Sequence, residues 1–187
     1  SFVEQKEIMQ ISEKMIKNII KEFCDETLDK FEVLNWHDAM EAYGCDKPDL
    51  RIPLKLIEIS DLVKDEEFKV FAEPAKDQNS RVVAMRVPNG NSLSRGQIDD
   101  YTKFVSKLGA KGLAYIKIND VKDLENGIQS PILKFLKSET ISNIVDVLKV
   151  QTDDLIFFGA GPQSVVNLSM SSLIKKLGED LNLYSSK

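Results

Sequence analysis

A short glycine-rich run is the strongest candidate for a ligand-binding motif in this sequence. Gly159-Ala160-Gly161-Pro162 follows an apolar segment and precedes a predicted helix, where backbone amides can bind a phosphate group. The third glycine of a dinucleotide-binding turn is replaced by Ser164, the lysine of a P-loop is absent, and Pro162 has no amide hydrogen. We therefore predict an ordinary turn between a strand and a helix. A free-standing nucleotide-binding protein would require this turn to hold phosphate.

Two pairs of adjacent carboxylates are candidates for acid–base or metal chemistry. Asp99 and Asp100 follow one another in a predicted helix, and Asp153 and Asp154 precede a predicted strand. Neighbouring side chains in a helix or strand point in different directions, so neither pair can readily share a proton or a metal ion. We predict that the first pair stabilises the start of its helix and that the second pair shapes a turn.

Nucleophilic and zinc chemistry both lack the residues that they need. His37 is the only histidine, and no G-x-S-x-G motif supplies a serine nucleophile for it. Cys24 and Cys45 lie far apart, without the C-x-x-C spacing of a zinc or redox site. We predict two free thiols in a reducing cytoplasm. The residue types therefore assign no catalytic, cofactor-binding or metal-binding residue.

The charge balance is that of an acidic protein. The 187 residues include 25 basic and 30 acidic ones, which gives a formal net charge of −5 and disfavours a dedicated nucleic-acid binder. The lysine pairs Lys134 with Lys137 and Lys175 with Lys176 are predicted to be solvated helix faces. No apolar run is long enough to cross a bilayer, and the initial serine leads us to expect a piece of a longer chain.

The first part of the sequence predicts mainly helix. Residues 8–23 predict an amphipathic helix whose wide apolar stripe should pack on another surface. Residues 31–34 predict a short strand, and Asn35 is placed to cap a short helix that runs to Met40. Prolines within residues 45–53 interrupt this pattern, so we place a boundary there, between residues 1–51 and residues 52–187.

The remaining sequence predicts short strands that alternate with helices. Strands are predicted over residues 54–59, 68–71, 81–87, 113–118 and 154–158. Helices are predicted near residues 61–64, from a capping box of Ser94 and Gln97 to Gly109, and from Pro131, Ser138 and Pro162. Hairpin-like steps favour an α+β fold: a two-layer α/β sandwich with a mixed or mainly antiparallel sheet, preceded by a helical segment.

Long collinear segments of the chain resemble the bacterial-type aspartyl-tRNA synthetases. The most distinctive is Gly109-Ala110-Lys111-Gly112-Leu113-Ala114-Tyr115-Ile116-Lys117. The other segments are residues 36–40, 43–51, 68–75, 81–88, 93–101, 130–136 and 154–160, of which residues 68–72 resemble a strand of the family's insertion. The departures are Cys45, where the family usually has serine, and Gly161-Pro162, where it usually has polar residues.

The resemblance implies a class II synthetase that activates aspartate with ATP and Mg²⁺ and then esterifies tRNA, working as a cytoplasmic homodimer. Residues 1–51 would belong to the catalytic domain, and residues 52–187 would form its GAD insertion domain. The family's phosphate-gripping arginines lie in an F-R-x-E motif and in a glycine-rich motif, and neither occurs here. The resemblance therefore implies a non-catalytic, inactive piece of an aspartate–tRNA ligase.

A second interpretation comes from another class of protein. A GAD domain also occurs in an amidotransferase subunit that acts on misacylated tRNA, but residues 36–51 resemble synthetase catalytic-domain sequence. Lys47 and Arg51 are the candidates for a tRNA or interdomain contact; alternatively, they pair with Asp46 and Asp49. Whether the parent enzyme charges asparagine tRNA as well stays open.

Overall fold

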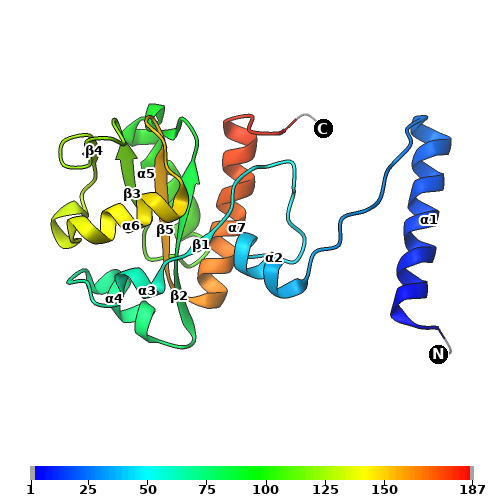
Figure 1. Cartoon of the computed structure of the whole chain (residues 1–187), viewed down its shortest axis with the longest axis horizontal. Coiled ribbons are helices and arrows are strands. Elements are labelled where there is room, and N and C mark those ends of the chain that lie inside the picture. The colour runs from blue at the N-terminus through cyan, green and yellow to red at the C-terminus, as the bar shows by residue number, and fades with distance from the viewer. Residues whose placement is uncertain (1–2, 186–187) are drawn as a thin grey trace. The chain divides into compact units, whose positions relative to one another are not determined.

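The structure is a computed structural model that describes residues 3–185. Its contacts divide the chain into two units, Ser1–Asn35 and Trp36–Lys187, both drawn in Figure 1. No helix among the described residues is both long and apolar enough to span a membrane.

The first unit is built around α1 (Gln5–Cys24), which confirms the predicted amphipathic helix. A capping box between Glu4 and Glu7 begins the helix, and Asp25, with φ of 54°, ends it. The apolar stripe is exposed along its whole length; it consists of Ile8, Ile11, Met15, Ile16, Ile19 and Phe23.

The strand predicted at residues 31–34 is wrong, because these residues adopt no regular structure. A strand needs a neighbouring strand to accept and donate its backbone hydrogen bonds. Residues 3–35 contain no other strand that could do so. The segment instead touches α1, since the Phe31 amide donates to Glu13 at 3.4 Å and Lys17 Nζ lies 5.7 Å from the Phe31 ring centroid.

The second unit is organised by a five-stranded sheet in the order β1-β2-β5-β3-β4. The strands are β1 (Ile57–Glu58), β2 (Ser80–Val87), β3 (Ala114–Ile118), β4 (Ile128–Gln129) and β5 (Leu155–Pro162). The helices are α2 (Trp36–Tyr43), α3 (Ser60–Val63), α4 (Lys69–Lys76), α5 (Arg95–Ser106), α6 (Ser138–Leu148) and α7 (Gln163–Asp180), with 3₁₀ turns η1 (Gly90–Ser92) and η2 (Leu133–Phe135). All of the pairings are antiparallel, which confirms the predicted α+β class.

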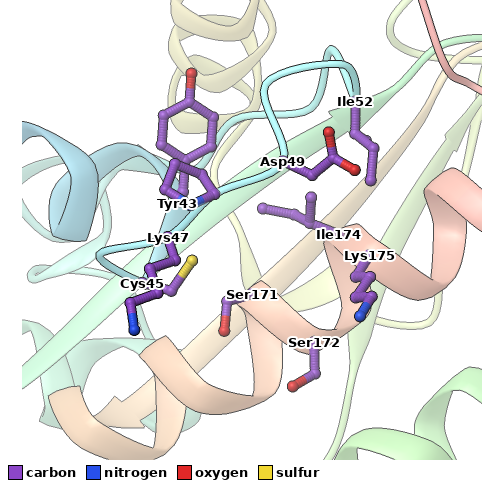
Figure 2. Close-up of a pocket in the computed structure, with 10 residues that line it drawn as sticks. Tyr43, Cys45, Lys47, Asp49, Ile52, Ser171, Ser172, Ile174 and Lys175 are labelled. Atoms are coloured by element: carbon purple, nitrogen blue, oxygen red, sulfur yellow. The ribbon is translucent and has the colours of Figure 1, made fainter. Parts of the chain in front are cut away.

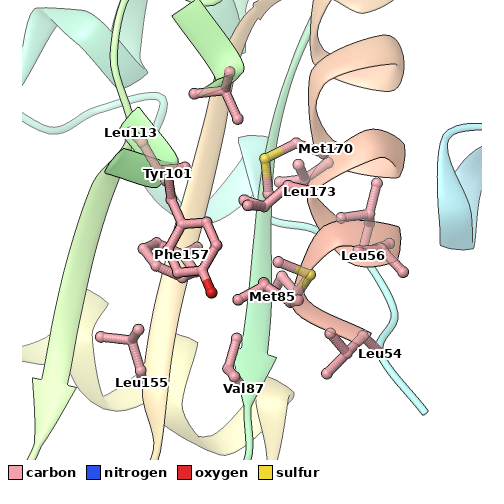
Figure 3. Packing of buried hydrophobic residues seen from close by; sticks show 14 of the residues in the cluster. Leu54, Leu56, Met85, Val87, Tyr101, Leu113, Leu155, Phe157, Met170 and Leu173 are labelled. Atoms are coloured by element: carbon pink, nitrogen blue, oxygen red, sulfur yellow. The ribbon is translucent and has the colours of Figure 1, made fainter. Parts of the chain in front are cut away.

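Helices cover both faces of the sheet, so the sheet is the middle one of three layers (Figure 1), where the sequence predicted two. On one face, Met85 and Phe157 pack against Tyr101 of α5 and against Met170 and Leu173 of α7 (Figure 3). The other face packs against α3, α4 and α6 through a second cluster that includes Phe71, Ile144 and Phe158. The two central strands are therefore buried on both sides, which explains why β2 and β5 read as nearly continuous apolar runs.

Residues 68–71, predicted as a strand, instead begin helix α4. Phe68, Phe71 and Ala75 recur at helical spacing and pack on the second cluster, and Ala72 on the same face is buried. A four-residue apolar run cannot distinguish the two periods, and here the helical one continues through Pro74.

The glycine-rich run is also not the turn that we predicted, because β5 continues through it to Pro162. Pairing with β2 accounts for this extension, since Ser80 lies opposite Pro162 and Val83 lies opposite Gly159. Helix α7 then begins at Gln163 without a turn between the two elements.

Helix starts were predicted with mixed success. The capping box of Ser94 and Gln97 is confirmed at the start of α5. Ser138 is not the cap of α6, because Lys137 holds that position. The buried carboxylate of Glu66 satisfies this helix end: it accepts hydrogen bonds from the Lys137 amide at 3.0 Å and from the Thr140 hydroxyl.

Candidate functional site

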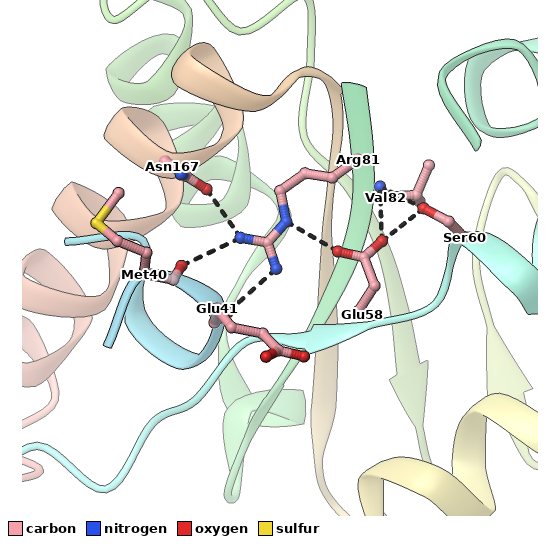
Figure 4. A network of polar contacts seen from close by, with 7 residues as sticks. All are labelled: Met40, Glu41, Glu58, Ser60, Arg81, Val82 and Asn167. Atoms are coloured by element: carbon pink, nitrogen blue, oxygen red, sulfur yellow. Dashed lines mark hydrogen bonds and ion pairs between the residues drawn. The ribbon is translucent and has the colours of Figure 1, made fainter. Parts of the chain in front are cut away.

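A buried arginine fixes α2 against the sheet and against α7 (Figure 4). Arg81 Nε donates to Glu58 Oε2 at 2.9 Å, and Nη1 donates to Asn167 Oδ1 at 2.8 Å. The same guanidinium donates to the backbone carbonyls of Met40 at 3.2 Å and Glu41 at 3.1 Å. These carbonyls belong to the last turn of α2, where helical partners run out. The Met40 carbonyl also accepts from the Gly44 amide at 3.0 Å. Arg81 thus caps a helix that lies far from it in the sequence.

The segment after α2 passes very close to α7. Gly44 has φ of +69°, and a Cβ atom at this position would lie 2.7 Å from the Asn167 carbonyl oxygen. Only glycine combines this backbone conformation with so close an approach. The segment then runs along α7 and leaves a pocket of about 310 Å³ between them, which we call the hinge pocket. Its lining (Figure 2) consists of Tyr43, Cys45, Lys47, Pro48, Asp49, Ile52, Ser171, Ser172, Ile174 and Lys175.

The structure separates the two candidates that the sequence suggested for a contact. Lys47 lines the hinge pocket together with Lys175 of α7. Arg51 pairs with Asp49: its Nε and Nη2 donate to the Asp49 carboxylate at 2.9 Å and 2.7 Å. The Arg51 guanidinium also lies over the Tyr184 ring, 5.0 Å from its centroid. Of the two residues, Lys47 is therefore better placed to contact a group from another domain or molecule.

The residues that line the hinge pocket can bind a group but offer no catalytic base. The pocket's two ammonium groups and the Ser172 hydroxyl can donate to an anion such as a phosphate, beside the carboxylate of Asp49. The Ser171 hydroxyl donates to the Leu168 carbonyl at 3.2 Å. The pocket contains no histidine that could act as a base toward Cys45 or a serine. No group of three or more metal-ligating side chains occurs anywhere within residues 3–185.

The other sequence candidates lie apart from this pocket. Asp99 and Asp100 are exposed on α5, and Asp100 pairs with Lys103 at 2.9 Å. His37 makes an edge-to-face contact with Trp36 at 5.1 Å between ring centroids. The predicted free thiols are confirmed for Cys24, which is exposed, and for Cys45, which lines the hinge pocket.

Asp154 shapes the turn before β5, as predicted, and does so as a buried group. Its carboxylate accepts hydrogen bonds from Arg86 Nε at 2.5 Å, from the Asn89 amide at 3.2 Å and from the Gln151 amide at 2.7 Å. The buried roles of Arg81 and Glu66, and the contact of the half-buried Arg86 with Asp154, were not predicted from the sequence. A charged residue inside an otherwise apolar strand was the available signal for the two arginines.

The family model described as GAD domain matches residues 71–170, which is more than half of the chain. The chain belongs to the GAD domain family. The match runs from α4 to α7 and contains strands β2 to β5. The hinge pocket lies at the border of the GAD match, because Lys47 precedes residue 71 and Ser171 follows residue 170.

Three relatives are similar to the chain over its whole length. The aspartate–tRNA(Asp/Asn) ligase of Legionella pneumophila strain Philadelphia 1 is 50% identical over 187 residues, which is 100% of this chain and 32% of that protein. The ligases of the same name from strains Corby and Paris are 49% and 50% identical, covering 100% and 99% of this chain and 32% and 31% of theirs. The chain thus spans about a third of the length of these curated relatives.

The pairing of Asp49 with Arg51 predicts that the Asp49 carboxyl titrates at a lower pH than an ordinary aspartate. Hydrogen bonds from the Arg51 side chain lower the pKa of the Asp49 carboxyl from 3.8 to about 2. The stabilisation that this pairing gives is therefore present above the unfolded pKa of 3.8 and is lost as the pH falls toward about 2. An Arg51→Met variant should return the pKa of Asp49 toward 3.8, which carboxyl carbon shifts in an NMR titration would report.

Lys64→Met is the matched control for this titration, because Lys64 pairs with Asp61 at 2.9 Å and should leave Asp49 unchanged. An unaltered Asp49 titration in the Arg51→Met variant would contradict the assignment of the pKa shift to Arg51.

Proposed function

We propose that the chain is part of an aspartate–tRNA ligase, in which it forms the GAD domain and the segment that leads into it. The parent enzyme would attach aspartate to tRNA with ATP. The observation that supports this most directly is the 50% identity across all 187 residues, because it extends well beyond the GAD match at residues 71–170. A GAD domain from a tRNA-dependent amidotransferase subunit would share the matched region but would not require this similarity on both sides of it.

We assign catalysis to the rest of the parent enzyme. The arginine motifs that grip ATP in the synthetase family do not occur in this sequence, and the hinge pocket has contact chemistry only. ATP and Mg²⁺ would therefore bind to residues outside this chain. We also propose a cytoplasmic homodimer as the parent. The names of the relatives specify both aspartate and asparagine tRNA, so we extend the proposal to both substrates.

Because catalysis is assigned to the rest of the parent enzyme, we expect the isolated chain to be inactive. A ligase in which this chain replaces the matching part should be active. The purified chain should give no aspartate-dependent pyrophosphate exchange above background. Replacing the matching third of the Legionella ligase with this chain should preserve aspartylation of tRNA, because the substituted part carries no reacting group. Exchange activity in the isolated chain would contradict the first expectation. A chimera that melts like the natural ligase yet fails to aspartylate tRNA would contradict the second.

We further propose that the hinge pocket supplies a weak phosphate contact to tRNA through Lys47. The net charge of −5 leads us to expect a Kd no tighter than about 1 μM at physiological salt, weakening as salt rises. Filter binding with aspartate tRNA would measure it. Lys47→Ala should weaken binding several-fold and lower the salt dependence. Lys64→Ala, which removes a lysine paired with Asp61, should not. Sub-micromolar binding, or equal effects of the two substitutions, would contradict the proposal.

A further inference from the structure

A second cavity of the second unit shares no lining residue with the hinge pocket. It is a groove of about 970 Å³, which we call the edge groove. Helix α4 forms one wall with Phe68 and Val70. The chain before β3 and the side chain of Val165 from α7 form the other side, and the end of β5 forms the floor. Nothing in the proposed ligase function uses this groove.

The floor of the edge groove is an unpaired stretch of strand. On one side, β5 pairs with β2 as far as Pro162. On its other side the ladder with β3 ends where Ala114 lies opposite Phe158. The chain that precedes Ala114 is not part of a strand, so β5 residues 159–162 have no neighbouring strand on the groove side. The sheet therefore has an open edge inside a cavity.

The register shows which backbone groups this edge presents. Residues of an antiparallel strand direct their N–H and C=O groups to alternate sides. The Ile118 amide donates to the Asp154 carbonyl, so Ile156, Phe158 and Ala160 also direct their backbone groups toward the β3 side. Beyond the start of β3, the Ala160 N–H and C=O face the edge groove. Within residues 3–185 neither group has a hydrogen-bonding partner.

The walls of the edge groove favour apolar side chains and no net charge. Phe68, Val70 and Val165 contribute apolar surface, and Val70 is 56% exposed. The charged lining is balanced, with Lys69 and Lys111 against Glu73 and Asp77. A phosphate or another strong anion would find no excess of positive charge there. An uncharged backbone with apolar side chains matches the lining.

Gly112 lines the open side of the groove, although the surrounding packing does not require a glycine there. At Gly112 an added Cβ would meet no atom within 4 Å, and its φ lies outside the left-handed range. The fold would therefore accept a side chain at this position. What the glycine provides is space and access to the backbone edge across the groove.

We propose that the edge groove binds an extended peptide segment, which adds to β5 as a further strand at Ala160. The peptide residue opposite Ala160 would donate to its carbonyl and accept from its amide, as in other cases of strand addition. Apolar side chains on the flanking residues would lie against α4 on one face and Val165 on the other. Recognition would combine two backbone hydrogen bonds with an alternating apolar pattern.

Two substitutions test the two parts of this recognition. Ala160→Pro removes the groove-facing amide but leaves the ladder with β2 intact, because that amide points away from β2. Gly112→Val fills the groove from its open side. Gly96→Val is the matched control, since Gly96 lies on α5 outside the groove and an added Cβ there meets only the Ser94 hydroxyl at 4.0 Å. All three variants should melt close to the natural chain.

The probe is a random heptapeptide library displayed on phage and selected on the full chain, after depletion on the Gly112→Val variant. We expect enriched peptides with alternating apolar residues that bind Ala160→Pro and Gly112→Val at least tenfold more weakly, and Gly96→Val normally. N-methylation of the central peptide residue should abolish binding. Failure to enrich peptides would overturn the proposal, as would equal binding to all variants. Dimerisation that both groove substitutions abolish, without peptide binding, would assign the edge to a second copy and also overturn it.

Discussion

An Arg81→Met variant is expected to unfold with a free energy about 3 kcal/mol lower than that of the natural chain. Arg81 is 6% exposed and makes four hydrogen bonds to groups on three separate elements. Methionine fills similar volume but donates nothing, so the Asn167 side chain and the Glu41 carbonyl lose this donor, while the Met40 carbonyl still accepts from the Gly44 amide at 3.0 Å. Glu58 is partly exposed and can be solvated by water, which places the effect at the low end for a broken buried ion pair.

Urea unfolding followed by circular dichroism would measure this loss, and Arg51→Met supplies the control. Arg51 also has a carboxylate partner, Asp49, but its side chain is 62% exposed. Solvent already screens that ion pair, so its removal should lower the urea midpoint much less than Arg81→Met does. Arg81→Lys should fall between the two variants, because an ammonium group cannot reach all four acceptors in one plane. An Arg81→Met midpoint equal to that of Arg51→Met would contradict the role given to Arg81.

Sequence patterns predicted best those elements whose signals are local. Helix α5 followed from the Ser94 capping box and its apolar spacing, and β2 followed from its run of β-branched residues. Errors arose where distant contacts decide the conformation. Residues 31–34 have strand-forming side chains but no ladder partner within the described first unit, whereas β5 extends through two glycines because β2 pairs with it there. The boundary expected near residues 45–53 stays a prediction about where the GAD insertion begins; the compact unit already begins at Trp36.

The candidate site was predictable only in part, for the same physical reason. Charge and position near the prolines singled out Lys47 and Arg51. Their different surroundings depend on α7, which supplies Lys175 to the hinge pocket, and on Asp49, which engages Arg51. Arg81 illustrates the limit most clearly: its partners lie on β1, α2 and α7, and no spacing within β2 could reveal them. The unpaired edge at Ala160 likewise follows from where β3 begins.

Helix α1 leads to the second large expected effect, which concerns association of the chain. Its stripe contains six large apolar side chains that are between 41% and 79% exposed. An exposed apolar surface of this kind favours an interface, since its burial contributes about 25 cal/mol per Å². We expect the isolated chain to form dimers in which α1 of one copy packs on α1 of another, with the stripes facing each other.

Replacing Ile11 and Met15 with lysine should convert these dimers to monomers in sedimentation experiments, because each lysine would place a charge at the centre of the apolar interface. Gln10→Lys adds a charge on the polar face of the same helix and should leave the dimer intact. The sheet-containing unit has its own core, so its thermal melting should be unaffected by either change. A chain that is monomeric before any substitution, with α1 amides that exchange rapidly, would contradict the association; its stripe would then be left to pair with the remainder of the proposed ligase.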